Sequence, residues 1–126
     1  CKILIKKYKI PINNIIGHSD IAPTRKIDPG EKFPWKILSK HKIGIWFNLN
    51  PKLLKKFRKK KIEKKQDKIK FFRYLNKVGY CTSLRTNNFV HNKILKAFQR
   101  HYRKDLINGL LDQECLIIAS NLAKKT

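Results

Sequence analysis

The chain has 126 residues, with 31 Lys or Arg against 8 Asp or Glu, so its formal net charge is +23 at pH 7. Such a charge favours a polyanionic partner such as nucleic acid, anionic lipid or an acidic polymer. No apolar run approaches the roughly 20 residues that a transmembrane helix needs, and three widely spaced cysteines argue against a disulfide framework or a zinc ribbon.

The first residues predict the end of an amphipathic helix, because apolar residues alternate with lysines from Cys1 to Lys9, before Pro11. The sequence contains no Met, which indicates a fragment or a processed product; a lipid-bearing Cys1 of a mature lipoprotein is the alternative. Residues 15–17, IIG, then predict a short buried strand. Such a strand delivers His18 at its end, on a rigid element that suits a metal site.

Residues 17–30, GHSDIAPTRKIDPG, form the one segment dense in groups that carry chemistry. His18 and Asp28 supply an imidazole and a carboxylate, both ordinary zinc ligands. Lys26 shares a face with Asp28 if the segment is extended, so its ammonium can stabilise an oxyanion beside the metal. The prolines and the closing glycine predict a shaped loop. Spacing alone leaves a simple surface His–Asp pair open as the alternative.

The whole string, continuing through Phe33-Pro34-Trp35, resembles the zinc-dependent N-acetylmuramoyl-L-alanine amidases of the type 2 family. That family's pattern reads approximately G-H-S-D-I-A-P-G-R-K-x-D-P-G-x-x-F-x-W. The resemblance implies that His18 and Asp28 are two of three zinc ligands and that Lys26 assists the transition state. Thr24 departs from the family's usual Gly, and it would be strained if the backbone there needs a positive φ.

The resemblance also implies a reaction, and it implies that one zinc ligand and the general base are not among these residues. The reaction is hydrolysis of the amide joining N-acetylmuramic acid to L-alanine, in which zinc polarises the carbonyl and activates water. The family's third ligand, a His, and its general-base carboxylate are expected upstream of Cys1, so the chain looks N-terminally truncated. His41 is a conceivable internal substitute; otherwise we expect it on the surface. With two ligands, the chain alone is expected to bind zinc weakly.

The segment after the motif predicts one helix, which starts near Phe33 and Trp35 with Pro34 in its first turn. Core packing is favoured over substrate contact for these two aromatic residues. Residues 51–67 are rich in lysine and predict either a solvated linker, helical in part, or an anion-binding strip. Because abundant Lys, Ile and Asn are typical of an AT-rich genome, and Lys does not recognise phosphate bidentately, we interpret the charge as mostly compositional.

Residues 68–126 predict three helices, the first of which ends at Gly79. The second begins near Asn88, and the third follows Gly109 with Asp112 as its N-cap. Three helices of this size make a bundle near the lower limit for an independent core, which we expect to fold alone and bind cell wall. The strings AFQRHY and NGLLD resemble the peptidoglycan-binding module that ends some of these amidases. His91 and His101 are expected on the surface.

The predicted fold is therefore an α+β fragment, the end of an α/β amidase domain in residues 1–50, mostly loop with one short strand and helices. A basic linker or helix follows at residues 51–67, and an all-α three-helix bundle at residues 68–126. Peptidoglycan or muropeptides are the expected partners, with no specific nucleic acid, and the bacterial cell envelope (periplasm or outer membrane) is the expected location, with the cytoplasm as alternative. The alternative functions are a non-catalytic peptidoglycan-binding remnant and a basic nucleic-acid-binding bundle.

Overall fold

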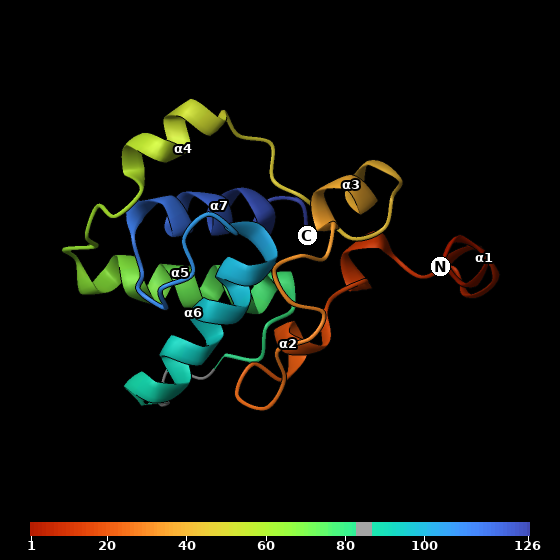
Figure 1. Cartoon of the computed structure of the whole chain (residues 1–126), viewed down its shortest axis with the longest axis horizontal. Helices are drawn as coiled ribbons and strands as arrows, with labels where there is room; N and C mark the ends of the chain where they lie inside the picture. The colour runs from red at the N-terminus through yellow and green to blue at the C-terminus, as the bar shows by residue number, and fades with distance from the viewer. Residues whose placement is uncertain (83–86) are drawn as a thin grey trace.

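A computed structural model describes residues 1–82 and 87–126, which form seven α-helices and one 3-10 turn (Figure 1). Within these residues there is no β-strand, only an isolated bridge between Lys61 and Asp112. The predicted α+β class is therefore wrong, and the described chain is all-α. The elements are α1 (Lys2–Tyr8), η1 (Ile12–Asn14), α2 (His18–Ile21), α3 (Trp35–Lys40), α4 (Pro51–Phe57), α5 (Lys65–Val78), α6 (Asn88–Tyr102) and α7 (Gln113–Ala123).

The strand predicted at residues 15–17 does not form. Ile15 follows η1 with extended backbone angles, φ −98° and ψ 100°, and Gly17 is the N-cap of α2. A strand exists only where a neighbour pairs its N–H and C=O groups, and no segment within residues 1–82 and 87–126 forms a ladder with it. His18 therefore opens a short helix instead of ending a strand.

The helices of the second half begin and end close to where the sequence predicts. Gly79 ends α5 with φ 120°, a value that a residue with a side chain rarely adopts. The side chain of Asn87 caps α6 by accepting a hydrogen bond from Val90 N at 3.0 Å. The side chain of Asp112 caps α7 in the same way, accepting from Cys115 N at 2.9 Å. Cap chemistry thus fixes these boundaries locally.

The core lies between α5, α6 and α7, with α5 and α7 packed along each other (Figure 1). Its centre contains fully buried apolar side chains from all three helices, namely Phe71, Leu75, Ile94, Phe98, Ile118 and Leu122. The same cluster includes Ile45 and Leu54, and Trp46 and Phe47 pack against it. Residues before the bundle therefore contribute to its core. The division of the chain at residues 50 and 67 stays a prediction.

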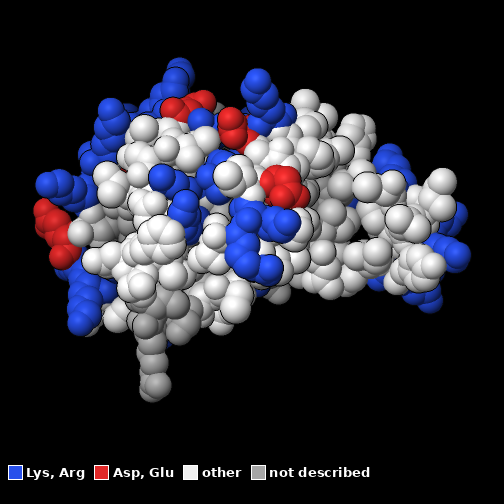
Figure 2. All heavy atoms as spheres, turned by 60° about the horizontal axis from the view of Figure 1, so that its bottom comes forward, with Lys and Arg blue, Asp and Glu red and all other residues white. Residues whose placement is uncertain are grey.

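Two surface features complete the fold. Helix α1 has no buried residue and lies at one end of the molecule (Figure 1). On the face drawn in Figure 2, Lys and Arg side chains form several separate groups among uncharged residues, with few acidic side chains between them. None of the described helices is both long and apolar enough to span a bilayer.

Candidate functional site

The loop from Gly17 to Gly30 folds back so that its two predicted zinc ligands meet. Ser19 N donates a hydrogen bond to Asp28 O at 2.9 Å, which closes the loop. This closure places His18 Nδ1 3.2 Å from Asp28 Oδ2. The two side chains are 52% and 64% exposed, so both remain accessible to a ligand from solvent.

Lys26 lies in the same loop, held by its backbone N–H, which donates to Ala22 O at 2.9 Å. Its side chain is exposed, and among the described residues its ammonium has no ion-pair partner. Thr24, the departure from the family pattern, is unstrained. The described non-glycine residues with positive φ lie elsewhere, at Lys9, Lys42 and Lys59.

Gly17 is required at the start of the loop because a side chain there has no room. A Cβ atom at this position would lie 2.9 Å from Pro29 Cδ and 3.3 Å from Trp35 Cζ2. It would also lie 3.1 Å from Asp20 Oδ2. The glycine therefore lets the two ends of the loop approach each other closely, as in other close backbone approaches.

Asp20 is the buried centre behind the loop, with 1% of its surface exposed. Its carboxylate accepts hydrogen bonds from Gly17 N at 2.9 Å, from the Tyr80 hydroxyl at 2.5 Å and from His101 Nδ1 at 2.7 Å. Burial raises the pKa of Tyr80 well above its ordinary value, and the neighbouring Asp20 charge adds to the increase. The hydroxyl of Tyr80 therefore stays protonated and donates.

The prediction that His101 lies on the surface is wrong. The residue is 4% exposed, and its ring stacks on that of Trp35 with centroids 4.2 Å apart. The sequence already indicates that His101 is buried, because it follows Ile94 by seven residues and Phe98 by three. Those spacings put it on the apolar face of α6.

The other aromatic and histidine residues divide between core and surface. Trp35 is 5% exposed, which confirms the core-packing interpretation for this residue. Phe33 is half-buried and packs on Trp35 at 4.7 Å between ring centroids. His41 is exposed, as predicted. His91 is half-buried, against the prediction of a surface residue, and stacks on Phe72 at 4.4 Å.

Within residues 1–82 and 87–126, the candidate donor set for zinc is smaller than a catalytic site needs. His18 and Asp28 fit zinc in donor type and in their closeness. A catalytic zinc normally has three protein ligands, and the described residues contain no group of three or more His, Cys, Asp or Glu that could hold a metal. The two side chains are therefore too few for such a site by themselves, and no catalytic step through a metal follows from these residues alone.

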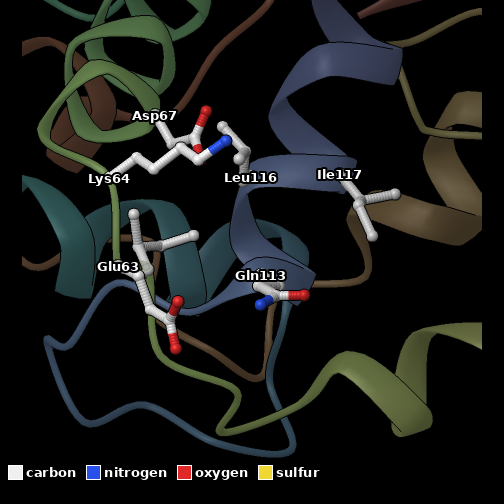
Figure 3. Close-up of a pocket in the computed structure, with 7 residues that line it drawn as sticks. Glu63, Lys64, Asp67, Gln113, Leu116 and Ile117 are labelled. Carbon is white, nitrogen blue, oxygen red and sulfur yellow. The ribbon is translucent and has the colours of Figure 1, made fainter.

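A separate hollow lies between the start of α5 and α7 (Figure 3). Its volume is about 300 Å³. The side chain of Lys64 lies toward Asp67 across one wall, and Gln113 faces the space from α7 (Figure 3). The hollow does not include His18, Lys26 or Asp28, so the candidate site is the exposed loop and not this pocket.

Two solved structures share this fold over almost the whole chain. A complex of the Escherichia coli N-acetylmuramyl-L-alanine amidase AmiD with the substrate anhydro-N-acetylmuramic acid-L-Ala-D-γ-Glu-L-Lys superposes with a TM-score of 0.80 and 32% identity, covering 98% of this chain and 48% of that one. AmpDh3 of Pseudomonas aeruginosa, in complex with anhydromuramic pentapeptide, gives 0.79 and 29%, covering 98% and 49%. The chain is therefore homologous to the type 2 family of N-acetylmuramoyl-L-alanine amidases.

Sequence relatives bear out the same class. N-acetylmuramoyl-L-alanine amidase AmiD of Escherichia coli K12 is 33% identical over 127 residues, covering 98% of this chain and 45% of AmiD. The 1,6-anhydro-N-acetylmuramyl-L-alanine amidase AmpD of Haemophilus influenzae is 51% identical over 35 residues, covering 27% of this chain and 19% of AmpD. No protein-family model matches the chain. The chain spans about half the length of AmiD, and the resemblance inferred from the motif is confirmed.

Proposed function

We propose that this chain supplies part of a zinc-dependent N-acetylmuramoyl-L-alanine amidase, which hydrolyses the amide between N-acetylmuramic acid and L-alanine. The observation that carries the proposal is the 3.2 Å approach of His18 Nδ1 to Asp28 Oδ2 in an exposed loop. The substrate in the AmiD structure, an anhydro-N-acetylmuramyl peptide, supports muropeptides as the substrate class. Turnover or recycling of peptidoglycan in the bacterial cell envelope is the proposed setting.

Each loop residue has a distinct role in this proposal. His18 and Asp28 are two of the three ligands that hold the zinc ion. A zinc ion in such a site polarises the scissile carbonyl and activates water. Lys26 is exposed in the same loop, and in this proposal its ammonium stabilises the negative charge that develops on the carbonyl oxygen.

The third ligand and the general base come from a segment outside these 126 residues. Support for this part comes from the absence of a three-donor group among the described residues and from the 45% share of AmiD that the chain covers. A catalytic group gains its rate advantage from being held in the productive geometry. We therefore expect the chain alone to cleave muropeptides negligibly.

The test is a chimera that joins this chain to the part of Escherichia coli AmiD that it does not match. Cleavage of anhydro-N-acetylmuramyl-L-Ala-D-γ-Glu-L-Lys is followed by chromatography for the chain, the chimera, and the chimera with Lys26→Ala or Lys32→Ala. We expect cleavage by the chimera only. Lys26→Ala should lower turnover on the order of 100-fold, whereas Lys32→Ala removes the same charge from the same exposed segment and should have little effect.

Two results would contradict the proposal. A folded chimera without any cleavage would favour the alternative, a non-catalytic peptidoglycan-binding protein, which the incomplete donor set also supports. Zinc-dependent cleavage by the chain alone would mean that the third ligand comes from within residues 1–126, and the proposal of an outside segment would fail.

A further inference from the structure

The buried carboxylate of Asp20 joins the motif loop to the helices of the second half. We propose that Tyr80 and His101, which hold this carboxylate, are positioning residues for the His18–Asp28 pair. The inference rests on the proposed function, because it assigns these residues to the geometry of that same site. It also gives the helical half a part in the site, in addition to any binding of cell wall.

The short helix that begins with His18 cannot hold its own orientation. Helix α2 has four residues, and helices of that length are unstable without tertiary contacts. Asp20 is its third residue, and its side chain reaches back to Gly17 N at 2.9 Å. The direction in which His18 projects therefore depends on what fixes the Asp20 carboxylate.

That carboxylate is fixed from two sides of the helical half. The Tyr80 hydroxyl, just beyond α5, donates at 2.5 Å, and His101 Nδ1, on α6, lies 2.7 Å away. The side chains of Asp20 and His101 are 2% and 3% exposed. A charge buried this deeply is costly without its partners, so loss of either donor favours movement of Asp20 toward water.

Trp35 adds a second contact between the helical half and the loop. Its ring is nearly parallel to that of His101, at 14° and 4.2 Å between centroids. The same tryptophan also lies against Gly17, where an added Cβ would be 3.3 Å from Trp35 Cζ2. The His101 ring therefore supports the loop both through its hydrogen bond and through the tryptophan.

Movement of α2 is transmitted to Asp28. The Ser19 N–H donates to Asp28 O at 2.9 Å, and Ser19 is between His18 and Asp20 in the sequence. If Asp20 leaves its pocket, this hydrogen bond weakens and the two proposed ligands separate. The Ser19 amide is therefore a direct reporter of the pair's geometry, and it can be measured without metal or substrate.

The experiment is amide hydrogen exchange by NMR on the full chain, comparing Ser19 with Ile118 in the core helix α7. The variants are Tyr80→Phe, His101→Leu, and His101→Asn, which retains a donor near the position of Nδ1. We expect Tyr80→Phe and His101→Leu to accelerate exchange of Ser19 at least tenfold more than that of Ile118. His101→Asn should restore part of the protection. Tyr74→Phe and His91→Gln alter a tyrosine and a histidine away from Asp20, and should not affect Ser19 selectively.

Equal acceleration at Ser19 and Ile118 would indicate a general loss of stability and would overturn the inference, as would unchanged exchange at Ser19. If His101→Leu does not fold, Tyr80→Phe decides the question. The outcome is separable from that of the proposed function, because the chimera with AmiD can fail to cleave muropeptides while the exchange result still holds.

Discussion

Gln99 shows how one buried residue determines local structure. Its side chain is fully buried, and its Oε1 accepts hydrogen bonds from Asn108 N at 3.0 Å and Gly109 N at 2.8 Å. Its Nε2 donates to Leu110 O at 3.0 Å. The glutamine of the string AFQRHY therefore closes the turn of the string NGLLD.

Replacement of Gln99 by Ala should leave two backbone N–H groups and one carbonyl without their partner. An unsatisfied buried group costs about 1–3 kcal/mol, but only Gly109 is buried, whereas Asn108 is half-buried and Leu110 exposed, so water can replace part of the lost hydrogen bonds. We therefore expect the free energy of unfolding in urea to fall by about 2–4 kcal/mol. Gln66, exposed in α5, is the matched control, and Gln66→Ala should change stability by less than about 0.5 kcal/mol. Equal effects of the two substitutions would show that the turn does not depend on Gln99.

At the scale of elements, the basic segment of residues 51–67 is attached to α7. Arg58 binds Glu114 bidentately, with Nε to Oε2 at 2.8 Å and Nη2 to Oε1 at 2.9 Å. The pair raises the pKa of Arg58 above its ordinary value. Gln113 N donates to Lys60 O at 2.9 Å. A bundle that begins at residue 68 would lose these contacts, so we now expect it to be less stable than the full chain.

The substitution Arg58→Ala tests this attachment. It leaves Glu114, which is 1% exposed, with Arg103 Nη1 at 3.3 Å as the remaining cation among the residues that the structure describes. Breaking a buried ion pair from one side costs about 3–5 kcal/mol, and we expect a loss of about 3 kcal/mol in urea unfolding. Arg58→Lys keeps the charge without the planar fork and should have an intermediate effect.

Lys56→Ala is the control for Arg58→Ala, because it removes the same charge from an exposed position in α4. Its effect should stay below about 0.5 kcal/mol. If Arg58→Ala is no more destabilising than Lys56→Ala, the segment is a solvated linker after all.

The elements also show what the sequence can and cannot predict. The last residue of α5 can be predicted from Gly79 and the first residue of α7 from Asp112, because capping is a local property of the backbone. The strand at residues 15–17 fails because strand formation depends on a partner that no local pattern reveals. The motif in the sequence predicts that His18 and Asp28 lie together. It does not predict that Asp20 is buried, because its partners Tyr80 and His101 are 60 and 81 residues away in the sequence.

At the scale of the whole molecule, most of the large exposed apolar side chains of the described residues lie in the first forty residues, in the same part of the chain as the motif. Leu53, Phe89 and Leu110 are exposed elsewhere. An exposed apolar side chain marks a place where another segment or protein packs only when it is part of one contiguous patch. The proposal that a further segment docks beside the loop and completes the zinc site therefore predicts that the apolar side chains nearest the loop become buried in the chimera. The residues concerned in the first forty, with 44–82% of their surface exposed, are Ile3, Leu4, Tyr8, Ile12, Ile21, Ile27 and Ile37.

The most direct test of the account is the zinc content of the chimera with AmiD after dialysis against metal-free buffer. If this chain supplies two ligands and the added segment supplies the third, the site has the three protein ligands of a catalytic zinc. We therefore expect one zinc per molecule in the chimera and in its His41→Ala control. His18→Ala or Asp28→Ala should each remove the metal while the chimera stays folded by circular dichroism. A folded chimera that keeps one zinc per molecule after loss of His18 or Asp28 would contradict the central claim that these two residues are ligands.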